Sequence, residues 1–295
     1  MSTDSMTSSG ILVGVDGSEF SDAAVRWAAR EAGLRREAVT LMTVLERKQP
    51  YIVTYDADAM LESRQSQHDE GDRILAAARQ IVEDAAGDLG LHRVQTQFLF
   101  AHPLWSLINA SWDARMVVVG CRGRSALERL TLGSISSGLA HHSHCPVAVV
   151  HPDVAEPDPH APILLGIDGS PASESATAIA FDAASRRRAP LIAMHAWENS
   201  FSPDGPHSRA AHQASGAEVL SERLAGWQET YPDVQVTPVV VHQDPGRWLV
   251  DHSDTGQLIV VGSHGRGGFA GMLLGSVSST VVQAAAIPVI VARQD

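Results

Sequence analysis

Basic residues are scarce in this sequence, and nearly all of them are arginine. The chain of 295 residues carries 22 Lys and Arg against 34 Asp and Glu, and Lys48 is its only lysine. A protein that binds duplex nucleic acid needs a basic face, so this balance argues against nucleic acid as a partner. An anionic ligand would have to be held by backbone N–H groups and a few arginines.

Cysteine and long apolar runs are also scarce. Cys121 and Cys145 are the only cysteines. The strands predicted below place them about 15 Å apart, since a strand rises about 3.3 Å per residue. A disulfide needs Cα atoms within about 7 Å, so free thiols and a reducing compartment are expected. No apolar run approaches the ~20 residues of a membrane-spanning helix, and the first ten residues lack the apolar region of a secretory signal. A cytoplasmic location without a membrane partner is the expectation.

What the sequence does contain is an internal repeat. The segment ILVGVDGS at 11–18 returns as ILLGIDGS at 163–170, and residues 120–150 align without gaps on residues 262–292. A chain of this length suits two domains, so the repeat predicts a duplicated domain. The predicted boundaries are 1–151 for the first domain, 152–162 for a Pro-rich linker and 163–295 for the second domain.

Short segments rich in β-branched residues alternate with helical patterns in both halves. In the first half, strands are predicted at 11–15, 39–45, 94–100, 116–120 and 146–151, and the second half repeats this series. The alternation indicates an α/β fold in which a parallel sheet carries helices on both faces. The apolar sequence LIVVG at 258–262 agrees, because both faces of such a strand are covered. A doubly wound sheet binds its ligand outside the carboxyl ends of the strands, where the strand order reverses.

Helical patterns fill the spaces between the predicted strands. The clearest ones in the first half predict helices at 21–34 and 65–90. Three tryptophans, Trp27, Trp105 and Trp227, fall in helical patterns, and we expect them to lie in the core.

A glycine-rich loop follows the fourth predicted strand of each half, and both loops keep the spacing Gly-x-x-Gly-x9-Gly-Ser. The matching residues are Gly120, Gly123, Gly133 and Ser134 in the first loop and Gly262, Gly265, Gly275 and Ser276 in the second. The first glycine would let the chain turn out of its strand, and the second would remove a Cβ beside a ligand. The last pair would open a helix with the serine as N-cap, where unpaired N–H groups and the helix dipole suit a phosphate. Plain helix capping is the alternative, but two loops that diverge around one spacing favour a shared ligand.

This motif, with an Asp at the end of the first strand, resembles the ATP-binding class of the universal stress protein family. The resemblance covers both halves, so the chain looks like a tandem two-domain member. It implies a five-stranded parallel sheet in the order 3-2-1-4-5 in each half, flanked by helices. It also implies ATP, with or without Mg²⁺, in each crevice, and assembly through the last strand, which makes a homodimer the expectation.

The resemblance also assigns roles by position. It places the phosphate and ribose contacts on the eight glycine and serine positions of the two loops. Asp16 and Asp168 match the aspartate near the adenine and ribose, although each could instead cap the following helix together with Ser18 or Ser170. The backbone of the second strand, which meets the adenine in this family, corresponds to Val44 and Ala196. Arginines inside the loops could contact phosphate; they are Arg122, Arg124 and Arg266.

The loops do not carry the residues of a fast phosphoryl-transfer enzyme. Neither contains a lysine, and the only acid in either loop is Glu128 of the first. We therefore expect a nucleotide-binding regulatory protein of the stress response, without catalytic or metal-ligating residues. An unidentified protein partner would recognise its nucleotide-dependent state. A slow ATPase or nucleotidyl-transfer enzyme is one alternative, and a nucleotide-free interaction scaffold is another. The segments 46–60 and 198–212 are candidate lids or partner surfaces. The sequence HHSHC at 141–145 has no counterpart in the second half, so a metal site is not expected there.

Overall fold

The computed structural model describes most of both halves of the chain. The described residues are 10–47, 57–86, 93–123, 132–152, 158–197, 206–265 and 274–293. The predicted linker at 152–162, the two candidate lids and the middle of each glycine-rich loop, with Arg124, Glu128 and Arg266, therefore lie partly or wholly outside the described residues.

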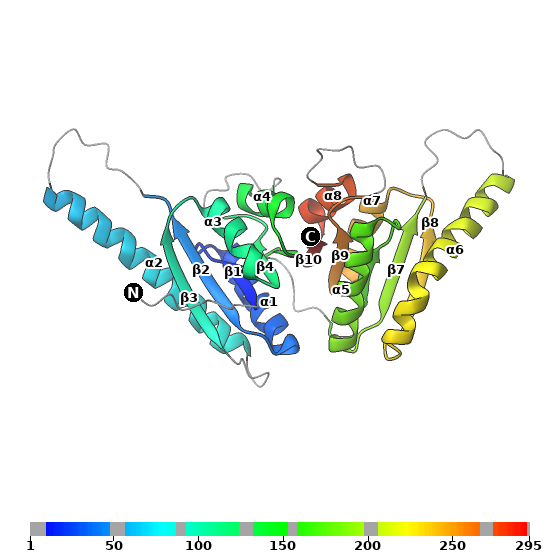
Figure 1. Ribbon diagram of the computed structural model, residues 1–295, viewed down its shortest axis with the longest axis horizontal. Coiled ribbons are helices and arrows are strands. Elements are labelled where there is room, and N and C mark those ends of the chain that lie inside the picture. Colours follow the sequence, from blue (N-terminus) through cyan, green and yellow to red (C-terminus); the bar gives the residue numbers. More distant parts are fainter. Residues whose placement is uncertain are drawn as a thin grey trace.

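The first half is built on a parallel sheet with strand order β3-β2-β1-β4-β5 (Figure 1). Its strands are β1 (Ile11–Gly14), β2 (Val39–Leu45), β3 (Val94–Phe100), β4 (Met116–Gly120) and β5 (Val147–Val150). Its helices are α1 (Glu19–Arg35), α2 (Ala57–Ala86), α3 (Pro103–Ala110) and α4 (Ser134–His142), with a 3-10 turn η2 at Ser111–Asp113.

The second half repeats this arrangement with strand order β10-β9-β6-β7-β8. Its strands are β6 (Ile163–Gly166), β7 (Leu191–Ala196), β8 (Val236–Val241), β9 (Leu258–Gly262) and β10 (Val289–Ala292). Its helices are α5 (Pro171–Arg187), α6 (Pro206–Thr230), α7 (Pro245–Asp251) and α8 (Ser276–Ala284), with a 3-10 turn η3 at Ser253–Thr255. The predicted α/β class and the strand order 3-2-1-4-5 in each half are confirmed.

The two sheets join into one sheet of ten strands through their last strands. Strand β10 runs antiparallel to β5, with Ile290 opposite Ala148, whereas the other strand pairs are parallel. The strands β3 and β8 lie at the outer ends of the sheet, and the C-terminus lies near its middle (Figure 1). Because the last strands pair inside the chain, the expected homodimer would need another surface, and it stays a prediction.

Each face of the sheet has its own hydrophobic core. Alternate residues of a strand point to opposite faces, so Leu12 packs on one face while its neighbours Ile11 and Val13 pack on the other. One core includes buried residues of α1, α2, α5 and α6, and the other includes residues of α3, α4, α7 and α8. This double coverage explains why β4 and β9 are apolar at almost every position.

The turn after the first strand of each half sets where the next helix begins. Gly17 and Gly169 both have φ of 76°, a region that favours glycine. The next residue, Ser18 or Ser170, is the N-cap, and its hydroxyl accepts the N–H of the residue three positions on. The sequence Asp-Gly-Ser is therefore explained in part by turn and cap chemistry.

A buried ion-pair network links α1 of the first half to α5 of the second. The Glu31 side chain is inaccessible to solvent and binds Arg35 Nε at 2.5 Å and the guanidinium of Arg187. Arg35 also reaches Asp182 of α5 at 2.8 Å. Burial alone would raise the pKa of Glu31, but Arg187 and Arg35 outweigh it and hold this pKa below its ordinary value.

On the other face, Arg293 connects the end of β10 to α4. It donates hydrogen bonds to the carbonyl oxygens of Ser143 at 3.0 Å and Ala140 at 3.1 Å. These carbonyls lie at the end of α4, where a cation satisfies unpaired acceptors and the negative end of the helix dipole. Burial lowers the pKa of Arg293.

The structure corrects some sequence expectations and confirms another. Trp105 is 55% exposed and so does not belong to the core, whereas Trp27 and Trp227 are partly buried against it. Cys121 and Cys145 are buried free thiols, as expected. Within the described ranges, no helix combines the length and the hydropathy that crossing a membrane requires.

Candidate functional site

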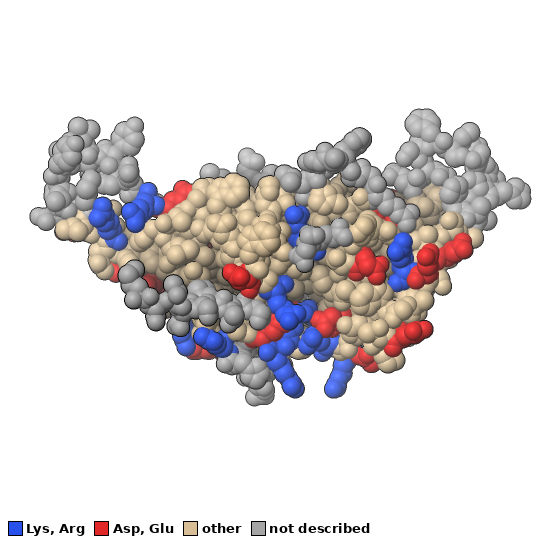
Figure 2. Space-filling view, in the orientation of Figure 1, with Lys and Arg blue, Asp and Glu red and all other residues tan. Residues whose placement is uncertain are grey.

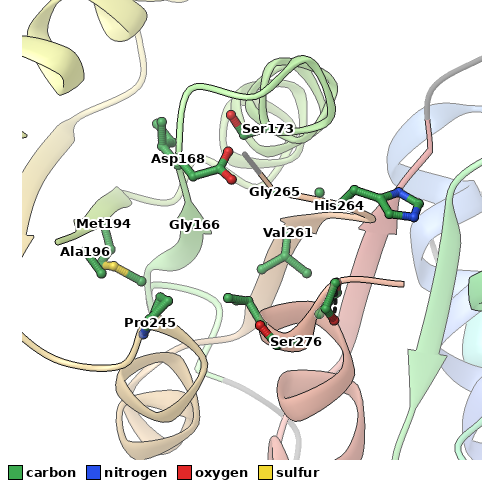
Figure 3. A pocket seen from close by; sticks show the side chains of 15 residues that line it. Gly166, Asp168, Ser173, Met194, Ala196, Pro245, Val261, His264, Gly265 and Ser276 are labelled. Atoms are coloured by element: carbon green, nitrogen blue, oxygen red, sulfur yellow. Dashed lines mark hydrogen bonds between the residues drawn. The ribbon is translucent and has the colours of Figure 1, made fainter. Parts of the chain in front are cut away.

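A cavity opens at the carboxyl ends of the first and fourth strands in each half. The first-half cavity lies beside β1, β2 and β4 and has a volume of about 690 Å³. The second-half cavity lies beside β6, β7 and β9 and has a volume of about 350 Å³ (Figure 3). Both volumes are typical of small-molecule sites, and both cavities lie where a doubly wound sheet binds ligands.

The structure brings all of the candidate site residues together at these two cavities. The first is lined by Asp16, Val44, Gly120, Gly123, Gly133 and Ser134. The second is lined by Asp168, Ala196, Gly262, Gly265, Gly275 and Ser276. The two sets occupy matching positions in the two halves, so the duplication preserved the site as a whole.

Each aspartate has one carboxylate oxygen engaged in the turn that starts the next helix. Asp16 Oδ1 accepts the backbone N–H of Ser18 at 3.0 Å and its hydroxyl at 2.6 Å. Asp168 Oδ1 accepts the N–H of Ser170 at 2.9 Å. The aspartate thus supports the capping serine and lines the cavity at the same time, so both roles expected from the sequence are compatible.

The second loop glycine is required by the other carboxylate oxygen. A Cβ at Gly123 would lie 2.6 Å from Asp16 Oδ2, and one at Gly265 would lie 2.5 Å from Asp168 Oδ2. The missing side chain therefore leaves space in which this carboxylate can lie against the loop. The first loop glycine has a different purpose from the one expected, because Gly120 is the last residue of β4 and packs against the backbone of Phe20 in α1.

Hydrogen bonds hold the start of α4 against the end of β4, and the second half repeats them. The N–H of Gly133 donates to the carbonyl oxygen of Cys121 at 2.8 Å, and the Ser136 hydroxyl donates to the same oxygen at 2.9 Å. The N–H of Gly275 and the hydroxyl of Ser278 make the matching bonds to Ser263, at 2.7 and 3.2 Å. The loop is therefore closed at its base, and a helix start is held beside the carboxyl end of the strand.

The expectation that Ser134 and Ser276 are N-caps was wrong. The N-caps are Gly133 and Gly275, and neither helix has a side-chain hydrogen bond at its cap. Each serine is instead the first helical residue. A glycine cap leaves the backbone N–H groups of the first turn without an internal side-chain acceptor, which suits an external anion better than a serine cap would.

Two short helices complete the cavities, although the sequence predicted neither their bounds nor their place at the site. Pro103, at the start of α3, and Pro245, at the start of α7, line the first and second cavity respectively. Both prolines occupy the first turn of their helix, where the missing N–H costs nothing. A proline at matching positions, shortly after the third strand of each half, was the signal that could have revealed these helices.

The two cavities differ in the cation at one matched position. Arg122 lines the first cavity, and its guanidinium carbon lies 5.9 Å from the centre of the Phe20 ring. The second half has His264 there, whose Nδ1 lies 3.0 Å from the Ser263 hydroxyl and whose ring turns away from Asp168 (Figure 3). The first cavity therefore has a permanent positive charge in its wall, and the described lining of the second has none at this position.

The histidines near the end of α4 take part in aromatic contacts. The His144 ring stacks on Trp112 with centroids 3.5 Å apart, and His142 lies 6.2 Å from Trp105. Across the residues that the structure describes, no group of three or more His, Cys, Asp or Glu side chains is placed to hold a metal ion.

The fold and the paired cavities define a class: a duplicated, doubly wound α/β protein with a small-molecule cavity at the switch point of each half. The model of the universal stress protein family matches residues 9–151 and 160–293. The chain belongs to the universal stress protein family, and it contains this unit twice in tandem.

Relatives of the same length and solved structures of the same fold agree with this assignment. The chain is 48% identical over 294 residues to universal stress protein Rv2005c of Mycobacterium tuberculosis, which covers 97% of each chain. It is 46% identical over 292 residues to universal stress protein Rv2623 of the same organism, covering 98% of this chain and 97% of that one. A crystal structure of a universal stress protein from Archaeoglobus fulgidus has a TM-score of 0.71 at 21% identity and covers 98% of this chain and 99% of the other, which shows the shared fold.

Proposed function

We propose that this universal stress protein binds adenine nucleotide, ATP above all, in the cavity of each half and acts as a nucleotide-dependent regulatory switch. One observation carries the proposal: matching sets of residues from separate strands, loops and helices line both cavities. A purely structural loop would need the glycines for packing, but it would not need an open cavity of nucleotide size above them.

The lining suggests how the nucleotide lies. The phosphates would meet the first-turn N–H groups of α4 or α8, which no side chain caps. The ribose would lie against Asp16 or Asp168. The adenine would face the wall formed by the second strand, which includes Val44 in the first half and Ala196 in the second.

Mg²⁺ fits this arrangement as a companion of the phosphates. Magnesium is commonly held by one or two carboxylates together with substrate phosphates. The space above Gly123 and Gly265, which a Cβ would fill, leaves Asp16 Oδ2 and Asp168 Oδ2 at the cavity where such a ligand would be needed. Bound there, Mg²⁺ would neutralise phosphate charge, and the aspartates would position it.

A regulatory role is favoured over rapid catalysis. Among the described residues, lysine is absent from the lining of both cavities, and Asp168 is the only carboxylate in the lining of the second. Fast phosphoryl transfer uses a charged clamp, a metal-binding acid and a positioned base. The described lining of the second cavity offers Asp168 for the metal, but no Lys or Arg for the clamp and no second carboxylate for the base. A slow ATPase is the competing proposal. ATP turnover by the purified protein well above about 1 s⁻¹, the low end of ordinary enzymes, would favour it.

The direct test is the nucleotide content of the purified protein. Mass spectrometry after gentle denaturation should release adenine nucleotide, and its amount per chain reports whether one or both cavities fill. Added ATP should also raise the melting temperature, since a ligand that binds only the folded state stabilises it. Absence of both effects would contradict nucleotide binding and favour the interaction scaffold.

The cellular setting follows as part of the same proposal. Two buried free thiols suit a reducing compartment such as the cytoplasm. Nucleotide bound at both cavities would change the surface that a regulatory partner or a second chain contacts. Light scattering of the purified chain with and without ATP tests whether a homodimer forms and whether nucleotide controls it.

A further inference from the structure

A third cavity lies between the two halves, away from the first-half and second-half cavities described above, which we call the crevices. It has a volume of about 600 Å³, and none of its lining residues lines either crevice. We call it the junction cavity, because its walls come from α1 and the end of β5 in the first half and from the end of α5 in the second. Figure 2 shows basic side chains gathered in the lower middle of the view, where α1 and α5 lie in Figure 1.

Arginines dominate the wall of the junction cavity. Among the described residues, the charged ones that line it are Arg26, Arg30, Glu31, Arg186, Arg187 and Arg188. This is a concentration of positive charge in a protein whose formal net charge is -12. A guanidinium presents a planar fork of donors that matches phosphate oxygens, so several of them around one space favour a phosphorylated ligand.

Part of this charge is neutralised inside the protein and part is not. Glu31 pairs with Arg187, and Asp182 pairs with Arg186 at 2.8 Å, which fixes these two guanidinium groups in the wall. Among the residues that the structure describes, no ion pair within 4.0 Å involves Arg26 or Arg188, although the charge of Arg26 acts on Asp22 of the same helix and opposes the rise in its pKa that burial causes. The cavity thus combines arginines that internal ion pairs hold in place, Arg186 and Arg187, with Arg26 and Arg188, which can contact an external anion.

The duplication accounts for only part of the arginine set. At the matching positions in the other half, Arg26 and Arg30 of α1 correspond to Ala178 and Asp182 of α5. Arg186 likewise corresponds to Leu34. Arg187 and Arg188, however, correspond to Arg35 and Arg36, so two of the five arginines recur at the matching place and three do not. The positive charge is therefore greater at one of the two pseudosymmetric places, whereas both crevices kept their shared residues.

We propose that the junction cavity binds a compact anion that carries two or more phosphate groups. The apolar side of the wall, with Trp27, Leu34 and Ala85, offers room for an organic group beside the phosphates. Such a ligand would contact arginines of both halves at once. It would therefore link α1 to α5 and stiffen the junction between the two nucleotide-binding halves.

The test is calorimetric titration of the full-length protein with inorganic tripolyphosphate at physiological ionic strength. The double variant Arg26→Gln, Arg188→Gln should bind at least about tenfold more weakly, because it removes one guanidinium group of each half that makes no close ion pair inside the protein. The variant Arg79→Gln, Arg247→Gln removes the same charge from exposed positions on α2 and α7, and it should bind like the wild type. Equal weakening in both variants would mean that only net charge matters, and it would overturn the proposal.

A second variant separates the junction cavity from the crevices. Ser134→Asp with Ser276→Asp puts a carboxylate at the helix start of each crevice, which should repel phosphates there and leave tripolyphosphate binding at the junction intact. If this variant loses tripolyphosphate and the arginine variant keeps it, the junction proposal fails while nucleotide binding in the crevices stands. No binding to the wild type also overturns it. A parallel titration with inositol hexakisphosphate shows whether an organic polyphosphate uses the same arginines, since the arginine double variant should then weaken its binding as well.

Discussion

Replacing Gly123 by alanine should weaken nucleotide binding in the first half without unfolding it. The new Cβ would lie 2.6 Å from Asp16 Oδ2, closer than real Cβ contacts come, so one of the two groups must move. The carboxylate lies at the end of a side chain that can rotate, and an off-rotamer side chain costs only about 0.5–1.5 kcal/mol. The same reasoning applies to Gly265→Ala and Asp168, where the distance is 2.5 Å.

The effect on binding should be larger than the effect on stability. A displaced carboxylate loses a charge-assisted hydrogen bond to the nucleotide, worth about 1.5–3 kcal/mol. At about 1.4 kcal/mol per factor of ten, Kd should rise about 10- to 150-fold. ATP at 100 times the wild-type Kd stabilises the fold by about 2.7 kcal/mol, and a site weakened 100-fold would retain only about 0.4 kcal/mol of this.

Isothermal titration with ATP, together with thermal melting, would measure both quantities. Each single variant should lose measurable ATP binding in its own half, so the stoichiometry should fall from two sites per chain to one. The double variant should show no ATP binding at either site. Gly226→Ala is the matched control, because a Cβ there meets no atom within 4 Å. An unchanged Kd in both variants would refute the argument that the carboxylate position matters. A large loss of stability without ATP would show that the glycine serves the fold alone.

The remaining predictions concern the junction between the halves. Glu31→Gln should lower the free energy of unfolding by about 3–5 kcal/mol in urea titrations at neutral pH, since it leaves buried guanidinium groups uncompensated. Glu83→Gln, which breaks an exposed pair on α2, should stay within about 0.5 kcal/mol of the wild type. Because the pKa of Glu31 is lower in the folded chain, its contribution is full above the unfolded value of about 4.3 and is lost as pH falls through the folded value. The wild type should therefore lose more stability on acidification than Glu31→Gln. Parallel curves of unfolding free energy against pH for the two proteins would contradict this. Arg293→Ala should cost about 1.5–3 kcal/mol by removing the donor to the carbonyls of Ala140 and Ser143, and no change in urea midpoint would show that water replaces it.

Short-range patterns explain how much of the site could be predicted. Asp16 and Gly123 come from separate segments, but each follows a strand, and parallel strands that are neighbours bring their carboxyl ends to one edge. The duplication repeated this pattern in the second half. Comparing the two halves therefore distinguishes the positions that kept the same residue from those that diverged. The loop motif and the first-strand aspartate were therefore enough to name residues that the structure brings to one cavity.

Features that depend on tertiary packing could not be predicted from these local patterns. Local sequence does not favour Gly133 over Ser134 as N-cap, because both residue types suit that position. Gly120 looked like a turn residue, but its lack of a side chain serves the approach of α1. Trp105 lies on an apolar helix, yet nothing in the described part of the chain covers its outer face enough to bury it.

The sequence by itself determined the class of fold, the duplication and the residues of each crevice, because hydrophobic period, turn chemistry and repeated spacing are local properties of the chain. The tertiary structure alone decided that β5 pairs with β10, that Glu31 meets Arg187, and that arginines of both halves surround one cavity. These contacts join residues that are far apart in the chain, and the residue types alone do not indicate which partner each one meets. They exist only because one sheet continues through both halves and brings α1 against α5.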